Sequence, residues 1–589
     1  MENQRNLILA VILSALLFFG WDAGMKHYYP QANKPVATQA APAATASTAP
    51  TREGGLASPA DRAAEALDLK TALNPAGRVP VAAPGLSGSI NLTGALLDDL
   101  TTNRHTASLN KADGPARVFS PAGTPAQHYA QLGWAAAGNT PGVELPSAAT
   151  VWTAPAGAKL TPQTPVTLTW ANATGQTFAI RYAIDQDYMI TADAVVANRG
   201  TAPVALQQIA QINRTEKTAS IDIWNLHSGP FGAFDGSVSF KPNYKDVTAA
   251  PGGLMTNEGT ANWLGFTDIY WMSALIPDKG VAKSDFRTSG DGFYFAQLFY
   301  AADTVAPGAQ VSHTTRVFAG AKESTVLDRY EAAGVTNFGK AIDWGWFFWF
   351  ERPIFWLLTA LVKAVGNFGV AIILLTVIVR GIMFPVAQRG FASMAAMRAV
   401  QPKLKVLQER YKDDKPTLQQ ETMKLYKDEG VNPLAGCLPM FLQIPVFFAL
   451  YKVLTLTVEM RHQPFVLWIH DLSAPDPAHI LNLFGLLPFT PPSFLGIGVL
   501  AVALGVTMWA QFKLQPSAPD PIQQQVFSIM PWMMMFVMAS FASGLLIYWI
   551  TSNILTIAQQ KYLYSKHPQM KAMVDKEKSD VAAAIKAKK

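Results

Sequence analysis

An arginine stands inside a long apolar stretch of the chain. Arg380 lies in "GVAIILLTVIVRGIMFPVAQ", residues 369–388, which otherwise has the character of a membrane-spanning helix. A charge at that depth costs about 2.5–3.5 kcal/mol on insertion scales. Thr376 lies four residues earlier, on the same helix face. Either the charge serves a function, or it snorkels to the cytoplasmic headgroups, since Pro385 follows closely.

Other apolar segments also carry polar residues. In the last of them, four residues have the helical spacing i, i+4, i+7 and i+11 and form a polar stripe: Trp549, Asn553, Thr556 and Gln560. Ser552 and Gln559 lie beside this stripe. Gln443 lies in the middle of an earlier segment. Because lipid cannot satisfy such groups, we expect the polar faces to meet around a wet or protein-filled space.

These residue types do not match an intramembrane enzyme. The apolar C-terminal segments contain no Asp or Glu, and all histidines lie outside them. The run "HDLSAPDPAHI", residues 470–480, has the residue types of a metal site, but it falls in a predicted outer loop. No phosphate-binding GxxxxGK[ST] motif occurs. We therefore expect no catalytic residues, no metal and no cofactor, and the single Cys437 excludes an intramolecular disulfide.

The composition predicts a soluble part joined to a membrane part. The chain has 589 residues, of which 50% are hydrophobic and 15% charged, and its mean hydropathy is +0.14. Near the N-terminus an apolar run ends at Trp21 and Asp22, a poor cleavage site, so an uncleaved anchor fits better than a signal peptide. The Ala-, Pro- and Thr-rich residues that follow are typical of a disordered linker.

Between the linker and the apolar segments, short runs such as "VTLTW", "FAIRYAI" and "MITADAVV" alternate with turn residues. This pattern predicts an antiparallel β-sandwich, a binding or spacing module. Residues 343–366 are aromatic but interrupted by charges, which favours an amphipathic helix at the membrane surface over a span.

The predicted fold is therefore a bundle of six transmembrane helices, five of them in the C-terminal part, joined to a periplasmic β-sandwich. In residue numbers, the expected segments are an anchor (1–24), a linker (25–84), the β-sandwich (85–335), a surface helix (340–366), membrane helix 2 (367–385), a cytoplasmic helical hairpin (386–432), membrane helix 3 (433–459), a periplasmic loop (460–493), membrane helix 4 (494–513), a hairpin of membrane helices 5 and 6 (526–563) and a basic cytoplasmic tail (564–589).

The basic residues orient this bundle. Residues 386–432 contain nine Lys or Arg and residues 561–589 contain eight, whereas the loop 459–493 has only Arg461. Positive residues remain in the cytoplasm, so we expect both termini inside and the β domain outside. The basic hairpin next to the membrane is either a docking surface or an ordinary solvated one.

Several blocks resemble the YidC/Oxa/Alb family of membrane-protein insertases, and most closely its Gram-negative bacterial YidC branch. They are "VRGIMFPVAQRGFASMAAMRAVQPKLKVLQERYKDDK", "YKDEGVNPLAGCLPMFLQIPVFFALYKVL", "FVLWIHDLSAPDP" and "SGLLIYWITSNILTIAQQ". The resemblance implies a non-enzymatic, cofactor-free insertase and chaperone of the inner membrane. Its expected partners are nascent membrane proteins, the ribosome through the basic tail and the hairpin, the Sec translocon with its accessory subunits, the signal recognition particle pathway and the lipid bilayer.

The resemblance also implies roles for individual residues. The family's intramembrane arginine, which lies in a hydrophilic groove, falls on Arg380, and a position that meets substrate falls on Thr376. The family's aromatic pair falls on Tyr548 and Trp549, where the second residue is ordinarily Tyr. The usual Pro-Ser-Gly turn begins with Ala542 here. The full set of expected groove residues is Arg380, Thr376, Gln443, Tyr548, Trp549, Asn553 and Thr556.

A second class of function fits the same arginine. A transporter or channel for a small anion would use Arg380 as its binding site, and ion flux into liposomes would distinguish it from an insertase.

Overall fold

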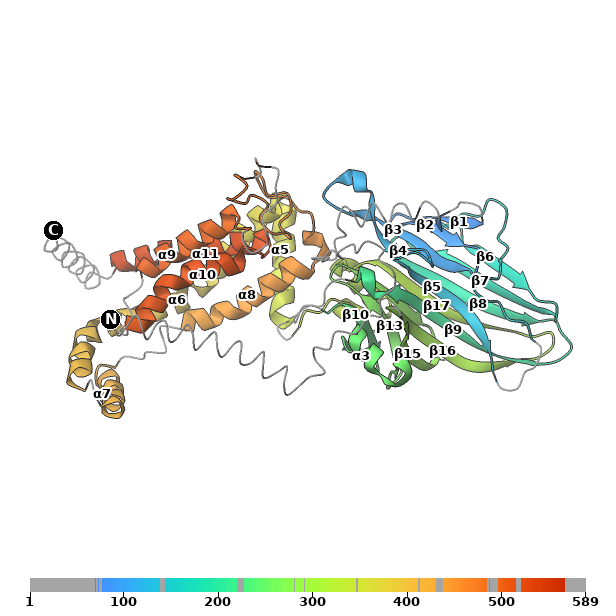
Figure 1. Cartoon of the computed structure of the whole chain (residues 1–589), viewed down its shortest axis with the longest axis horizontal. Coiled ribbons are helices and arrows are strands. Elements are labelled where there is room, and N and C mark those ends of the chain that lie inside the picture. The colour runs from blue at the N-terminus through green and yellow to red at the C-terminus, as the bar shows by residue number, and fades with distance from the viewer. Residues whose placement is uncertain are drawn as a thin grey trace, which may run out of the picture. The chain divides into compact units, whose positions relative to one another are not determined.

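The computed structural model describes residues 69, 72–73, 77–137, 143–219, 227–279, 281–290, 292–345, 348–411, 414–430, 438–484, 487, 496–514 and 521–566. The predicted anchor and nearly all of the predicted basic tail lie outside these residues. In Figure 1 the described strands run from blue to yellow-green and the helices α5 to α11 from yellow to red.

The β domain consists of two antiparallel sheets, with nine and eight strands in the described residues, which confirms the predicted sheet-rich domain. The first has the order β1-β2-β3-β5-β9-β16-β15-β12, with β4 paired to β3, and the second β11-β10-β13-β14-β17-β8-β7-β6. The first sheet contains β1 (Arg78–Ala82), β2 (Leu86–Asn91), β3 (Leu96–Thr106), β4 (Pro115–Phe119), β5 (His128–Ala136), β9 (Val204–Thr215), β12 (Leu254–Thr256), β15 (Val281–Gly290) and β16 (Phe293–Val305). The second contains β6 (Val166–Ala171), β7 (Gln176–Ile184), β8 (Met189–Asn198), β10 (Gly229–Phe234), β11 (Ser237–Ser239), β13 (Ala261–Thr267), β14 (Trp271–Pro277) and β17 (Gln310–Ala321).

Alternation of side chains explains the strands. Along β7 and β8 every second residue is buried, and buried Phe178 pairs with buried Val196 across the two strands. Such cross-strand apolar pairs stabilise a sheet that has one buried face. The domain begins before the predicted residue 85. Residues 78–82, "RVPVA", also alternate between buried and more exposed side chains, and they form strand β1, which pairs with β2.

Aromatic side chains close the core where the chain leaves the sheets. After the short helices α3 (Tyr244–Ala249) and α4 (Ser324–Ala332), the fully buried ring of Phe338 packs edge-on against Trp263 at 5.5 Å and against Phe318 at 5.3 Å between centroids. Edge-to-face pairs of this kind add to the free energy gained by burying the rings.

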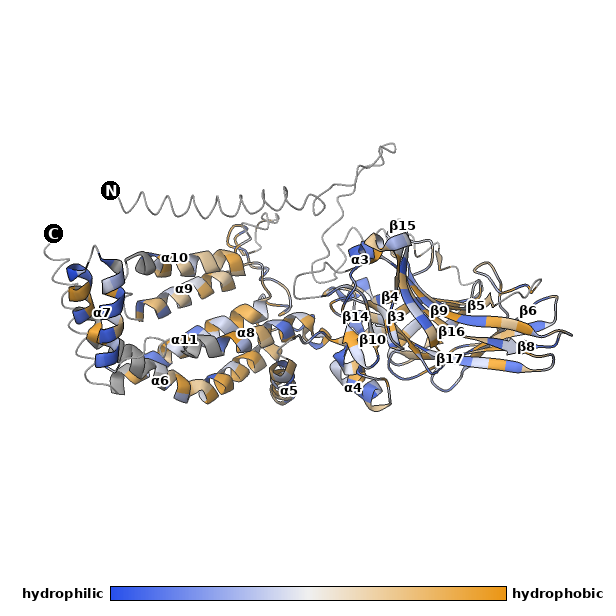
Figure 2. Ribbon diagram, turned by 90° about the horizontal axis from the view of Figure 1, so that it is seen from below, coloured by the Kyte–Doolittle hydropathy of each residue, from blue (hydrophilic) through white to orange (hydrophobic). Residues whose placement is uncertain are grey.

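The rest of the described chain is helical. Its helices are α5 (Phe348–Val365), α6 (Phe368–Arg410), α7 (Lys415–Asp428), α8 (Leu438–Leu456), α9 (Val499–Leu514), α10 (Pro521–Met538) and α11 (Ser543–Lys566). In Figure 2, α9 and α10 are coloured mainly hydrophobic, whereas α7 includes strongly hydrophilic residues. This contrast agrees with apolar spans and a polar hairpin.

The helix α6 is longer than expected. The sequence predicts a span that ends at Pro385, followed by a separate hairpin helix, but one helix of 43 residues continues to Arg410. It begins where the side chain of Asn367 accepts a hydrogen bond from the Val370 N–H at 3.1 Å. The helical pattern of the hairpin therefore continues that of the span without an interruption.

Only part of the predicted set of spans is supported by length and composition. Within the described residues, 368–388 form the one helical segment that is long and apolar enough to cross a membrane. Three shorter apolar segments, Gln443–Leu456, Val499–Leu514 and Gln525–Met538, fall where spans were predicted. The count of six spans therefore remains a prediction.

The helix α5 has the two faces expected of a surface helix. Phe348, Trp349 and Trp356 are exposed, while Glu351 and Leu358 are buried. The pKa of Glu351 is raised to about 7, because the effect of burial exceeds the opposing effect of the positive charge of Lys452 in α8. The acidic residue that interrupts the apolar sequence thus points into the protein, while the tryptophans remain exposed.

Candidate functional site

Arg380 of α6 meets α11 through a serine. The Arg380 Nε donates to Ser552 Oγ at 3.1 Å, and Nη2 donates to the same oxygen. Ser552 is buried, whereas Arg380 retains partial exposure. In the described part of the chain no carboxylate pairs with Arg380. The guanidinium therefore has a hydrogen-bond partner but no counter-charge among the described residues.

A second polar pair joins α8 to the same helix. The Gln443 side-chain amide donates to the hydroxyl of Tyr548, which is one helical turn before Ser552 on α11. The other amide atom, Gln443 Oε1, is buried and has no partner among the described residues. Polar side chains of α6, α8 and α11 thus come together.

The remaining predicted residues do not all face this cluster. The hydroxyls of Thr376 and Thr556 donate within their own helices, to Ile372 O and Ser552 O, both at 2.7 Å. Such back-bonding satisfies a buried hydroxyl without a partner helix. Thr376 is 1% exposed, so its side chain is enclosed by protein.

Two more predicted residues contact other helices. Asn553 donates to Thr507 Oγ1 of α9 at 3.2 Å, and Trp549 packs edge-on against Phe447 of α8 at 5.2 Å. Thr507 was absent from the expected set. A single mid-helix threonine gives no periodic signal, so sequence reasoning had no means of selecting it.

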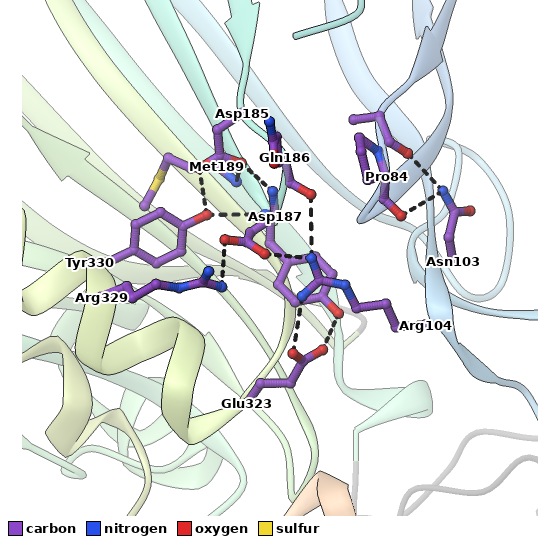
Figure 3. Close-up of polar contacts among 12 residues, drawn as sticks. Pro84, Asn103, Arg104, Asp185, Gln186, Asp187, Met189, Glu323, Arg329 and Tyr330 are labelled. Carbon is purple, nitrogen blue, oxygen red and sulfur yellow. Dashed lines mark hydrogen bonds and ion pairs between the residues drawn. The ribbon is translucent and has the colours of Figure 1, made fainter.

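The β domain has its own charged cluster, in which Arg104 of β3 lies between two carboxylates (Figure 3). Its guanidinium pairs with Glu323 at 3.1 Å and with Asp187. Arg329 of α4 also binds Asp187, at 2.8 Å, and His105 binds Glu323 at 2.9 Å. Asp187 is shared between two arginines, and Glu323 also accepts from the hydroxyl of Tyr188, so the cluster joins β3, the β7–β8 turn and α4 rather than presenting a free acid or base.

Polar contacts also join the β domain to the residues that follow α8. The guanidinium of Arg461 donates to the carbonyls of Thr106 at 2.7 Å and Ala107 at 2.9 Å. The partly buried carboxylate of Glu459 accepts the N–H of Ser324 at the start of α4, at 3.0 Å. The end of α8 and the β domain therefore lie together, and Arg461 serves as a structural residue.

The residues with metal-site composition have structural partners. Asp471 accepts from Ser473 N at 2.8 Å, and Asp476 accepts from Leu500 N at 2.8 Å at the start of α9. Among the residues that the structure describes, no group of three or more His, Cys, Asp or Glu could hold a metal ion.

A buried lysine gives a test of the packing of the β domain. Lys322 is 2% exposed and donates to Thr267 Oγ1 at 3.1 Å, and its burial lowers its pKa to about 8. The unfolded chain therefore binds more protons between that value and about 10.4, so the lysine favours unfolding most below pH 8. Lys322→Met should raise the free energy of unfolding at pH 7 by on the order of 2 kcal/mol.

Thermal unfolding of the full chain in detergent at pH 7, 9 and 10.5 measures this effect. The difference between Lys322→Met and the unmodified chain should shrink as the pH rises, because the buried lysine then becomes neutral in both states. Lys340, which is exposed, supplies the control Lys340→Met. A difference that is constant across this pH range would contradict the role of burial.

Family comparisons agree with this architecture. A model described as the YidC periplasmic domain matches residues 78–357, and a model described as the 60Kd inner membrane protein matches residues 360–571. Together with two antiparallel sheets followed by apolar helices, these matches define an inner membrane protein with a periplasmic domain.

The relatives make the family specific. The membrane protein insertase YidC of Zymomonas mobilis subsp. mobilis is 43% identical over 569 residues, with 96% of each chain covered. That of Rhizobium meliloti is 40% identical over 592 residues, with 98% of each covered. The chain belongs to the YidC family of membrane protein insertases, which confirms the resemblance seen in the sequence.

A solved structure is also similar. The crystal structure of an active YidC insertase, with its first transmembrane domain resolved, is 19% identical and has a TM-score of 0.35. The match covers 82% of this chain and 92% of that one.

Proposed function

We propose that this protein inserts nascent membrane proteins into the lipid bilayer, without enzymatic chemistry, and that Arg380 receives the polar tails of its clients in a hydrophilic groove. The proposal rests on one observation. The charge of Arg380 is held by the neutral hydroxyl of Ser552, with no carboxylate in the described residues to neutralise it. An ionised residue inside the membrane without a counter-charge is costly, so its retention favours a functional role.

The physical role follows from this uncompensated charge. A positive group inside the membrane attracts acidic residues of a tail that must cross it. The unpartnered Gln443 Oε1 adds an acceptor that water or a client N–H can fill. Hydration at this point shortens the apolar distance that a polar tail crosses. The client's helix then gains about 25 cal/mol for each Å² of apolar surface that it buries in lipid.

We further propose a location and partners. With the positive residues inside, both termini are cytoplasmic, and the β domain lies on the periplasmic side together with the end of α8. The contacts of Arg461 with β-domain carbonyls support that shared side. The basic hairpin and tail would meet the ribosome, and the Sec translocon with its accessory subunits and the signal recognition particle pathway are further partners.

Site-specific photocrosslinking tests the client path. A photoreactive amino acid at Thr556, on the polar face of α11, should form adducts with a stalled nascent membrane protein. The same group at Ile554, which is 52% exposed and two residues away, should give far weaker adducts. Equal adducts at the two positions would contradict a defined polar path. Flux of a small anion into proteoliposomes that depends on Arg380 would instead support the transporter alternative.

A further inference from the structure

The loop between α8 and α9 exposes bulky apolar side chains at its two turns. They are Val466 and Leu467 in the first turn, and Ile480, Leu481, Leu483 and Phe484 in the second. We name these six residues the apolar tips. Leu467 is 78% exposed and Phe484 60%, the values expected of polar loop residues.

The backbone of the apolar tips adds a second signal. Leu467, Leu483 and Phe484 have φ angles of 57°, 51° and 62°. The left-handed region is normally occupied by Gly, Asn or Asp, and a bulky residue there is an outlier that costs free energy. In water neither the strained backbone nor the exposed side chain would be compensated. The sequence retains large apolar residues at positions that favour Gly or Asn.

The loop itself is held firmly, so the tips are not the ends of a loose segment. The buried carboxylate of Asp476 accepts from Trp468 Nε1 at 2.9 Å and from Ala478 N at 3.0 Å. Phe484 N donates to His479 O at 2.8 Å, which closes the second turn. These bonds fix the backbone that carries the exposed side chains.

The same loop is bonded to the first residues of three helices. Asn367, which caps α6, donates to Phe465 O at 3.0 Å. Leu500 N of α9 donates to Asp476 at 2.8 Å, and Gly544 N of α11 donates to Leu472 O at 2.9 Å. All three helices belong to the proposed membrane bundle and start on one side of it. The loop therefore lies at the level where the lipid bilayer begins.

We infer that the apolar tips insert into the outer leaflet of the membrane and anchor the periplasmic end of the bundle in it. Apolar side chains are also exposed on the helices to which the loop is bonded, such as Val377 of α6 and Val506 of α9, and a lipid surface would cover them together with the tips. A solvated loop at this level would expose six large apolar residues to water. This inference rests on the proposed transmembrane placement of α6, α9 and α11, but its tests do not measure insertion.

Spin labelling tests the anchor in the full chain. In a Cys437→Ser background, a nitroxide is attached to Phe484→Cys or Leu467→Cys, and the protein is placed in vesicles of phosphatidylethanolamine and phosphatidylglycerol. Lipid contact predicts that oxygen relaxes these labels several-fold more than a water-soluble nickel chelate does. Val151→Cys, a 66% exposed position of the β domain, should show the reverse order.

Two outcomes would overturn the inference. Labels at the tips that respond like the one at residue 151 would place the tips in water. Labels protected from both reagents would show that protein, either a partner or a second copy, covers them. If the proposed insertase function fails while the oxygen preference holds, the anchor stands independently.

Asparagine substitutions give a second test, in which lipid contact and exposure to water predict different changes of the thermal midpoint. Asn adopts the left-handed region readily, so Leu483→Asn with Phe484→Asn relieves the backbone while it removes the apolar side chains. In vesicles, lipid contact predicts a lower thermal midpoint by several degrees. Exposure to water predicts an unchanged or higher midpoint and would overturn the inference. Val151→Asn, the control, should leave the midpoint unchanged.

Discussion

Arg380→Ala should lower insertion most strongly for clients whose translocated tails carry Asp or Glu. A carboxylate near an uncompensated guanidinium in a partly hydrated site gains about 1–2 kcal/mol, which corresponds to roughly five- to thirtyfold in rate. Neutral tails should lose little. The measurement is protease protection of client tails of graded charge, with all variants at matched expression.

The remaining substitutions at this position separate charge from geometry. Arg380→Lys should keep most of the activity because the charge remains, although the forked donor geometry is lost. Arg380→Glu should be the most damaging for acidic tails, since attraction becomes repulsion. Ser552→Ala is the matched control, because it removes the hydrogen-bond partner and leaves the charge in place.

Snorkelling makes the opposite prediction. If Arg380 only reaches the headgroups, alanine removes a costly charge from the membrane and every client should be inserted as well as before. Equal insertion of acidic and neutral tails by Arg380→Ala would therefore contradict the electrostatic role and leave the arginine as an anchor.

The second large effect is expected at Asp476, which is 1% exposed. Its carboxylate accepts three hydrogen bonds, from the indole of Trp468 and from the N–H groups of Ala478 and Leu500. Asp476→Ala leaves these donors unsatisfied and removes the cap of α9. We expect the free energy of unfolding to fall by about 3 kcal/mol, which is the cost of losing the cap added to the cost of leaving a buried donor unpaired.

Thermal unfolding in detergent and hydrogen exchange of residues 499–503 should detect this loss. Asp476→Asn, which keeps one acceptor oxygen and nearly the same volume, should lie between alanine and the unmodified chain. The close approach of Gly498 to the Asp476 side chain makes a larger replacement unsuitable. Unchanged exchange at the start of α9 in the alanine variant would contradict the capping role.

The sequence by itself determined the kinds of element and their order. Alternating residues in β7 and β8, and apolar runs such as residues 369–388, reflect which faces meet water, protein or lipid. That signal is local, because every residue of a strand or helix carries part of it. The intramembrane arginine was also visible, since a charge among apolar residues is conspicuous without any tertiary knowledge.

The tertiary structure decided which polar groups meet. Arg380 and Ser552 are 172 residues apart, and the local sequence around either residue does not indicate that the two are in contact. Thr376 lies on the predicted polar face, yet its hydroxyl donates to a carbonyl within α6, because a threonine can form a hydrogen bond with the backbone of the preceding helical turn. Hydrophobic periodicity fixes which face of an element is buried. The partner of a side chain on that face depends on how several elements pack, which only the folded chain specifies.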